Sequence, residues 1–328
     1  MPTALIEAAG FLPFRLYGDP QGGQPRSMPR GPSDVRSDLL EFANSWVHLI
    51  AGGRYDFVDH FVVSNSRKYI LQLVERLRAI SNPPSVHILD RAVGQSDAAR
   101  DFNRAQVLKL RRTLESWSGS AFDSTALADA VRRYNRRAAE MMRIAGLRER
   151  PEPRLSGLDA IRAIAIARWM HSADFLEQVT NVTESPPLPG VPLFLSGSGQ
   201  DQDIVYAAAE MAGAIIVGEC HPWSARLLEQ QIGDGDPFDA VAEHYARNAD
   251  FVVPLREWTD VVAQRFKRSG AHALLNFVYA HDDGMLWEGP SQTAVCAGPH
   301  VMLAGQPYRV DTGAIADAVA DLCRAWAA

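Results

Sequence analysis

Two short polar stretches of this chain carry side chains that could bind a metal ion or transfer protons. The first is Glu219-Cys220-His221 and the second is His281-Asp282-Asp283, and each directly follows an apolar run. Thiolates, imidazoles and carboxylates are metal ligands when three or four of them converge. They also act as general acids and bases within hydrogen-bond reach of a substrate. Hydrogen-bonded loops at strand ends would show the same residues, so all three interpretations remain open.

A third polar stretch, Ser196-Gly197-Ser198-Gly199, lies between the apolar run Pro192–Leu195 and a segment with helical spacing. Such a turn could bind a phosphate, because glycines let the backbone approach closely and the amides at a helix N-terminus attract anions. The third glycine of the dinucleotide fingerprint is absent, and Asp201 and Asp203 would repel a phosphate. A plain tight turn is therefore the competing interpretation.

The elements that must position these stretches alternate between strand and helix near both ends of the chain. Strands are expected at residues 13–17, 57–63, 86–89, 192–195, 214–217, 273–279 and 301–303. Helices are expected at 4–9, 34–50, 69–80, 102–117, 125–145, 156–180, 204–211, 237–246, 260–269 and 312–327. This order indicates parallel βαβ units, and ligands of parallel sheets bind at the carboxyl ends of the strands.

The fold class expected is α/β, with two doubly wound parallel-sheet lobes of the Rossmann or flavodoxin type and a helical middle region. The boundaries expected are an N-terminal lobe at 1–97, a helical region at 98–185 and a C-terminal lobe at 186–328. A chain of 328 residues is long enough for about two domains. A ligand would favour the cleft between such lobes.

Composition narrows the class of protein. The net charge is -6 and no basic patch with interleaved aromatic residues occurs, which argues against nucleic acid as a partner. No apolar run reaches the roughly 20 residues of a membrane span. The cysteines, Cys220, Cys296 and Cys323, are odd in number and far apart, which argues against a disulfide framework and favours the cytoplasm.

Several stretches together resemble the 2-hydroxyacyl-CoA dehydratase component D and benzoyl-CoA reductase family. The resemblance extends over nearly the whole chain, and each stretch alone is weak. The stretches are Ile6–Leu16 (IEAAGFLPFRL), Asp59–Leu77, Leu108–Gly119, Leu127–Arg137, Ser196–Trp223 and Phe277–Arg309, which includes Gly305-Gln306-Pro307-Tyr308-Arg309.

The resemblance implies two similar α/β lobes and a heterodimer of related subunits. It also implies an iron–sulfur cluster held by cysteines near the cleft, an acyl-CoA thioester as substrate, and an ATP-dependent activator protein that supplies an electron. The chemistry implied is one-electron reduction of the thioester to a ketyl radical. Under this resemblance, Ser196, Gly197, Ser198, Gly199 and Arg226 would contact the cofactor portion of the thioester.

The chain departs from the family where the cluster would be held. The positions equivalent to the family's cysteines fall at Ser33, Arg67 and His281, and none of these is a cysteine. Because iron–sulfur clusters need thiolates at fixed positions, we expect this chain to bind no cluster and no other metal itself. Arg67 could instead place a cation near the substrate or the partner.

Three functions follow from this departure. The chain could be a non-cluster subunit whose paralogous partner bears the cluster, and this interpretation is preferred. It could instead be a stand-alone acyl-CoA-binding or regulatory protein without redox chemistry. It could also be an enzyme with acid–base chemistry of its own, carried by His221, His281 and the carboxylates Glu219, Asp282 and Asp283.

Overall fold

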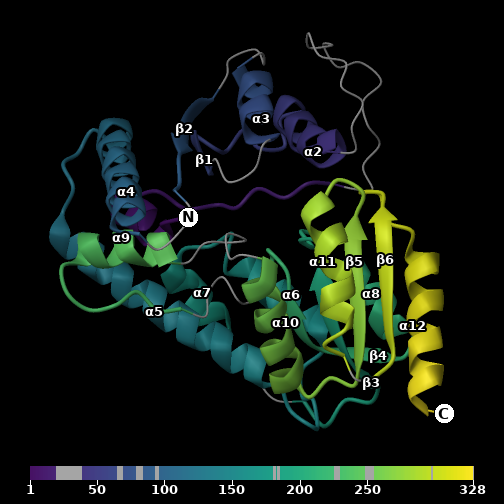
Figure 1. Cartoon of the computed structure of the whole chain (residues 1–328). Helices are drawn as coiled ribbons and strands as arrows, with labels where there is room; N and C mark the ends of the chain where they lie inside the picture. Colours follow the sequence, from purple (N-terminus) through teal and green to yellow (C-terminus); the bar gives the residue numbers. More distant parts are fainter. Residues whose placement is uncertain are drawn as a thin grey trace. The chain divides into compact units, whose positions relative to one another are not determined.

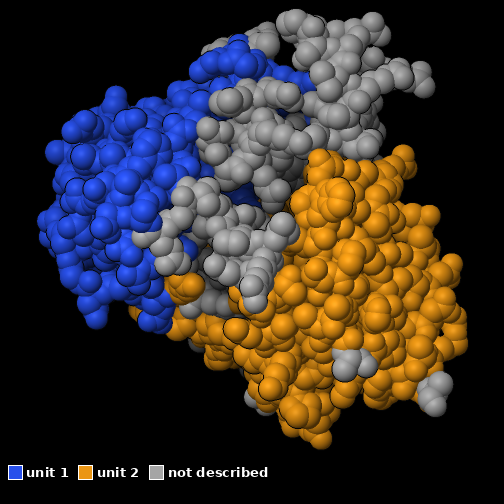
Figure 2. Space-filling view, in the orientation of Figure 1, with its two compact units in different colours: residues 1–135, 231–252 blue, residues 136–230, 253–328 orange. Residues whose placement is uncertain are grey.

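A computed structural model covers the chain and describes it in two compact units, which Figure 2 colours separately. Unit 1 comprises Met1–Asn135 and Gln231–Val252, and unit 2 comprises Arg136–Gln230 and Val253–Ala328. The structure describes all residues except 20–38, 65–68, 79–83, 93–95, 180–181, 183–184, 225–229, 248–254, 297 and 328. No helix in the described part is long and apolar enough to cross a lipid bilayer.

The first part of unit 1 is built around a two-stranded parallel sheet. Its elements are α1 (Thr3–Ala8), α2 (Leu39–Ala51), β1 (His60–Ser64), α3 (Tyr69–Arg78) and β2 (Ser85–Leu89). β1 and β2 run parallel with α3 between them in sequence, as expected of a βαβ unit. Val47, Leu73 and Leu77 form a buried cluster, because the apolar faces of α2 and α3 meet there.

Three helices complete unit 1, and one of them comes from far along the chain. α4 (Asp97–Ser118) begins at Ser96, whose side chain accepts a hydrogen bond from the amide of Ala99, and ends at Gly119. The first half of α5 (Ser124–Gly146) follows, and α9 (Pro237–Arg247) packs against α4. The side chain of Asn135 holds the segment before α9 through two hydrogen bonds to the backbone of Ile232, of 2.9 and 2.8 Å.

Unit 2 contains a four-stranded parallel sheet in the order β4-β3-β5-β6 (Figure 1). The strands are β3 (Val191–Gly197), β4 (Ala214–Cys220), β5 (Ala273–Tyr279) and β6 (His300–Gln306). Every residue of β4 and β5 is buried, as expected of strands covered on both faces. Because all four strands run parallel, their carboxyl ends lie along the same edge of the sheet.

Helices cover both faces of this sheet. α8 (Ile204–Met211) packs against α12 (Thr312–Ala327), and α10 (Leu255–Ser269) packs against α11 (Asp283–Thr293). Figure 1 shows α11 in front of β5 and α8 behind the sheet. The second half of α5, α6 (Gly157–Ile166) and α7 (Ser172–Val179) precede the sheet in sequence, and α6 packs against α8 and β4.

The start of α6 fits closely against the sheet, and a glycine makes this possible. A Cβ at Gly157 would lie 2.5 Å from the Cβ of Ile216, which is closer than side chains can approach. The carboxylate of Glu210 accepts hydrogen bonds from the amides of Gly157, Leu158 and Ile216, at 2.7, 3.3 and 3.2 Å. Burial raises the pKa of Glu210, and these three amides oppose the rise.

The structure confirms the α/β class, the parallel strands and the helical middle, and it corrects four local predictions. Residues 13–17 form no strand, because Phe14 and Tyr17 pack with Tyr55 instead of the backbone joining a sheet. The helix predicted at 156–180 is two helices, α6 and α7. β4 is longer than predicted and includes Glu219 and Cys220. α11 was not predicted, and it contains Pro290.

The doubly wound plan of two lobes is not established. The described part of unit 1 has only β1 and β2, whereas unit 2 has the covered four-stranded sheet. Segment 231–252 lies with the N-terminal part of the chain, although it is late in sequence. The three boundaries expected from sequence remain a prediction.

Candidate functional site

The predicted polar stretches of unit 2 do meet at the carboxyl edge of the four-stranded sheet. Ser196 and Gly197 are the last two residues of β3, and Glu219 and Cys220 are the last two of β4. His281 and Asp282 lie just after β5. Arg226, Ser33 and Arg67 lie outside the described residues, so their predicted roles stay predictions.

The turn after β3 is tied to the end of β5 through one serine. Ser198 donates from Oγ to Oδ2 of Asp282 at 3.0 Å and accepts the amide of Tyr279 at 3.0 Å. The amide of Ser198 donates to the carbonyl of Phe277 at 2.8 Å. Gly197 has φ +111°, and a Cβ there would lie 2.2 Å from that same carbonyl, so the tight approach requires glycine.

This turn is a packed junction rather than an open cradle in the structure. Ser196 and Ser198 are both buried, and the Ser196 hydroxyl has no hydrogen-bond partner among the described residues. The two acidic residues that follow already have partners: Asp201 accepts from Tyr308 at 2.9 Å and Asp203 from Arg162 at 2.8 Å. Nothing in the described geometry aims the turn at an anion, and phosphate binding by residues 196–199 remains a prediction.

Beside the turn, the rings of Tyr279 and His281 stack on each other at the end of β5. Tyr279 donates to the side chain of Gln200 at 3.3 Å and stacks on His281, with 5.4 Å between ring centroids and 10° between planes. Burial raises the pKa of Tyr279 well above its ordinary value, and the charge of Asp201 adds to the rise. His281 is half-buried, so its ring lies at the rim of this layer.

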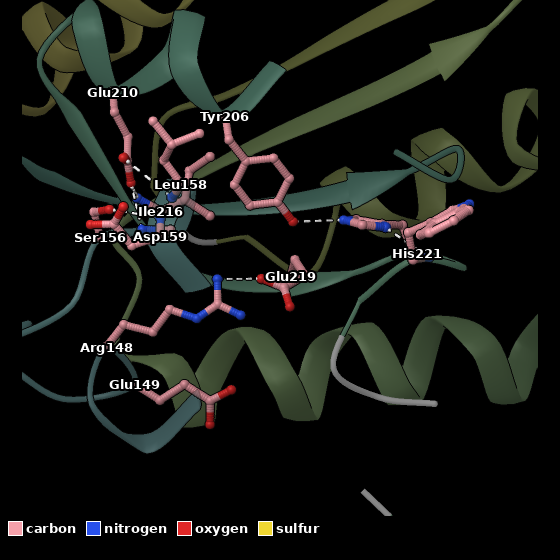
Figure 3. A network of polar contacts seen from close by, with 12 residues as sticks. Arg148, Glu149, Ser156, Leu158, Asp159, Tyr206, Glu210, Ile216, Glu219 and His221 are labelled. Atoms are coloured by element: carbon pink, nitrogen blue, oxygen red, sulfur yellow. Dashed lines mark hydrogen bonds and ion pairs between the residues drawn. The ribbon is translucent and has the colours of Figure 1, made fainter. Parts of the chain in front are cut away.

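Glu219 lies in a buried polar network at the end of β4 (Figure 3). Arg148, just after α5, forms an ion pair with its carboxylate, and Tyr206 of α8 is hydrogen-bonded to it. Burial lowers the pKa of Arg148, but the adjacent Glu219 charge outweighs it and the net direction is upward. Burial raises the pKa of Tyr206, and Glu219 adds to this.

His221 continues the same network. Its Nε2 lies 2.7 Å from the hydroxyl of Tyr206, and its Nδ1 accepts the amide of Trp223 at 3.2 Å. The next residues are also fixed: Arg168 donates to the carbonyl of Ser224 at 2.8 Å and lies 4.9 Å from the ring centroid of Trp223. The loop after β4 is thus held from two sides.

The predicted site residues therefore form two groups rather than one metal site. Glu219 and His221 belong to the Arg148 network, while Asp282 and His281 belong to the Ser198 junction. Among the described residues, no three His, Cys, Asp or Glu side chains converge as metal ligands would.

The cysteines do not fit an iron–sulfur cluster. Cys220 lies at the carboxyl end of β4, whereas Cys296 precedes β6 and so lies at the opposite edge of the sheet. A strand of seven residues spans about 20 Å. Burial raises the pKa of Cys296 and of Cys323, which disfavours the thiolate form that ligates iron. The sequence contains no fourth cysteine.

Sequence reasoning missed the residues that organise the β4 end, namely Arg148, Arg168 and Tyr206. Arg148 stands among charged residues and prolines, and Arg168 lies in the apolar stretch Ile164–Met170. Charged side chains are usually exposed, so neither arginine was expected to be buried. Tyr206 lies at a helical position next to alanines, where an aromatic ring reads as core packing. No local signal marks the three as partners.

Comparison with known proteins adds independent information. A family model described as "2-hydroxyglutaryl-CoA dehydratase, D-component" matches residues 1–287. One of the subunits of benzoyl-CoA reductase from Thauera aromatica is 24% identical over 248 residues, which are 72% of this chain and 63% of that protein. "Putative dehydratase subunit YjiM" of Escherichia coli (strain K12) is 26% identical over 164 residues, 46% of this chain and 43% of that protein. The matches thus span less than two thirds of the length of either relative.

Proposed function

Because the chain belongs to the 2-hydroxyglutaryl-CoA dehydratase D-component family, we propose that it is a subunit of a complex acting on an acyl-CoA thioester. The observation that carries this proposal is the family match over residues 1–287. Its similarity to a protein named as part of benzoyl-CoA reductase favours a role within an assembly. In this proposal the partner is a related subunit, and an ATP-dependent activator serves the complex.

Within that complex, we propose that this chain is the subunit without the cluster. The donor set supports this role, because Cys220 and Cys296 lie at opposite edges of the sheet and a cluster needs about four thiolates in one place. The partner would hold the iron and sulfide and perform the electron transfer. This chain would contribute surface, backbone groups and side chains to substrate binding.

The carboxyl edge of the unit 2 sheet is the part of this chain proposed to face the thioester. Parallel sheets bind ligands there. The Ser196–Gly199 stretch begins with the last two residues of β3, and Arg226 and His281 come after β4 and β5 in sequence. His281, at the rim, and Asp282 are the groups proposed for proton transfer to or from the acyl group. The hydrogen bond from Ser198 to Asp282 would keep that segment in place while substrate binds.

Because the cysteines do not fit an iron–sulfur cluster, a second function is also consistent with this chain. It would be a stand-alone acyl-CoA-binding protein of the same fold. The two proposals differ in what the isolated chain does. A binding protein would bind an acyl-CoA saturably without any partner. A non-cluster subunit would gain most of its affinity when the partner is present.

The experiment is co-expression with a cysteine-complete paralogue from the same genome, followed by anaerobic purification. Titration calorimetry with benzoyl-CoA and 2-hydroxyglutaryl-CoA is then done on the complex and on this chain alone. The subunit proposal expects a stable complex that binds one of the thioesters at least tenfold more tightly than the isolated chain does. Equal affinity of the isolated chain supports the binding-protein alternative. No association and no binding would contradict both.

A further inference from the structure

Two tyrosine–histidine pairs in this protein have similar contacts and opposite surroundings. In unit 2 the hydroxyl of Tyr206 lies 2.7 Å from Nε2 of His221, and in unit 1 the hydroxyl of Tyr134 lies 3.1 Å from Nε2 of His244. The rings meet edge-on in both pairs, at 75° and 80°. The difference lies at the other ring nitrogen, which fixes where the imidazole proton sits.

The proton of His221 is fixed by a backbone amide. The N–H of Trp223 points at Nδ1 from 3.2 Å, and an amide can only donate. Nδ1 must therefore carry a lone pair, which leaves the single proton of the neutral ring on Nε2. That proton is donated to the Tyr206 hydroxyl, because Nε2 and that hydroxyl are in hydrogen-bond contact.

Tyr206 can accept from His221 because its own proton goes elsewhere. Its hydroxyl is hydrogen-bonded to the Glu219 carboxylate, which has no proton to give while Arg148 is paired with it. The direction of these three bonds is then set: the Trp223 amide donates to His221, His221 donates to Tyr206, and Tyr206 donates to Glu219. A charged His221 would force its second N–H against the Trp223 amide.

The charged groups around His221 do not favour protonation either. Glu219 is neutralised by Arg148, and Glu149 is paired with Arg268 at 2.9 Å. Glu210, on the same helix as Tyr206, is turned toward three backbone amides of other segments. His221 itself is 1% exposed, so a positive charge would have no water to solvate it.

We propose that His221 is a positioning residue, locked as the neutral Nε2–H tautomer at the end of a buried relay of Arg148, Glu219 and Tyr206. What it positions is the loop after β4. Pro222 packs against the turn after β3, since a Cβ at Gly199 would lie 3.0 Å from its ring. The relay therefore sets the shape of both polar turns. By the proposed function, on which this last step rests, proton transfer falls to the His281 segment instead.

His244 provides an internal comparison with the reverse arrangement. Its ring is hydrogen-bonded to the backbone of Gln231 in a contact that raises its pKa, which identifies Gln231 as the acceptor. Since Nε2 faces Tyr134, Nδ1 is the donor to Gln231, and Nε2 accepts the Tyr134 hydroxyl proton. The two histidines are thus expected to be opposite tautomers in the same chain.

The test is long-range ¹H–¹⁵N correlation spectroscopy of the full chain labelled at its imidazole nitrogens, between pH 5.5 and 8. The His221→Gln and His244→Gln variants assign the two rings. We expect His221 to show an unprotonated Nδ1 and a protonated Nε2 with no titration in this range, and His244 to show the opposite nitrogen protonated. A proton on Nδ1 of His221, or a titration midpoint near pH 6.5, would overturn the proposal.

Tyr206→Phe adds a second readout, with Tyr134→Phe as the matched control in the other unit. Loss of the Tyr206 hydroxyl should speed solvent exchange of the His221 Nε2 proton at least tenfold, while Tyr134→Phe leaves it unchanged. Equal exchange in both variants would contradict the relay. If Tyr206→Phe does not fold, the wild-type spectrum alone decides. Neither readout needs an acyl-CoA, so a failed relay is distinguishable from a failed function.

Discussion

Ser198 donates a hydrogen bond to Asp282 across 84 positions of sequence and thereby joins the turn after β3 to the end of β5. The same hydroxyl accepts the Tyr279 amide, and all three residues are buried. One hydroxyl thus forms hydrogen bonds with both a buried carboxylate and a buried amide. This junction, more than any metal or phosphate motif, gives the carboxyl edge of unit 2 its form.

Removing the Ser198 hydroxyl should destabilise the folded protein. We expect Ser198→Ala to lower the free energy of unfolding by about 1–3 kcal/mol, because it removes two buried hydrogen bonds, one to the Asp282 carboxylate and one from the Tyr279 amide. Urea denaturation followed by circular dichroism measures it. Ser118→Ala, at an exposed helix end, serves as the control and should change stability by no more than about 0.5 kcal/mol. Equal effects of the two substitutions would contradict the role assigned to Ser198.

The free energy of unfolding should fall strongly when one partner of the Arg148–Glu219 ion pair is replaced, and less than additively when both are replaced. Arg148→Met or Glu219→Leu alone is expected to lower the free energy of unfolding by about 3–5 kcal/mol, because the remaining charge is buried and has lost its oppositely charged partner. The double variant should cost clearly less than the sum. A double-mutant cycle by urea denaturation measures the coupling.

The control for that cycle is the exposed pair of Arg324 and Asp321 on α12. Replacing either residue by alanine should change stability by less than about 1 kcal/mol, since water solvates the charge that remains. Additive effects of Arg148→Met and Glu219→Leu would show that the buried pair is not coupled as described.

Gly157 and Gly146 give a matched pair of glycine substitutions in unit 2. A Cβ at Gly157 would meet Ile216 at 2.5 Å, so Gly157→Ala must displace the start of α6 from β4 and should cost at least about 1–3 kcal/mol. Gly146, in the last turn of α5, has nothing within 4 Å of a Cβ, and Gly146→Ala should be neutral or stabilising by up to about 1 kcal/mol. Melting temperatures of the two variants should therefore move in opposite directions, or only that of Gly157→Ala should fall.

Unit 1 should lose stability in mild acid because of His244. Burial lowers its pKa to about 4, and the positive chain terminus adds to this, while the bond to Gln231 opposes it. The unfolded chain then binds a proton as the pH falls below about 6.5, whereas the folded chain does so only near 4. Stability is therefore complete above pH 6.5 and falls by on the order of 2 kcal/mol between pH 6.5 and 4.

Hydrogen exchange of the α9 amides, followed by mass spectrometry from pH 7 to 4.5 and corrected for intrinsic rates, measures this loss locally. In the His244→Gln variant, residue 244 has no titratable side chain. The protection of its α9 amides from hydrogen exchange should therefore depend less on pH than in the wild type. If wild type and variant show the same pH dependence, another group is responsible.

The existence of β3, β4 and β5 and the polar residues near their carboxyl ends could be predicted from sequence, but β3 and β4 extend beyond the predicted ends. The contacts that join these ends could not be predicted. Apolar runs without polar alternation marked β3, β4 and β5, and polar residues after them marked the edge that parallel strands share. The sequence did not predict α11, because Gly289 and Pro290 are poor helix formers. The predicted strand at 13–17 failed because alternation of aromatic residues fits packing onto Tyr55 equally well.

Contacts between distant segments explain most of what the sequence left open. Whether Arg148 is exposed or buried depends on Glu219, 71 positions later, and a local pattern contains no trace of that partner. The same holds for Arg168 and its acceptor Ser224. Residue types at the edge were therefore predicted, while their pairing into a Ser198 junction and an Arg148 network required the fold.

The claim that this chain is the cluster-free subunit is tested most directly by iron and acid-labile sulfide analysis. The chain is purified anaerobically, alone and in complex with its cysteine-complete paralogue. We predict less than about 0.2 iron per isolated chain and a full cluster's iron and sulfide in the complex, lost when the paralogue's cysteines are replaced by serine. Stoichiometric iron and sulfide on the isolated chain would contradict the account, and Cys220 and the His281 segment would then be the first ligands to replace.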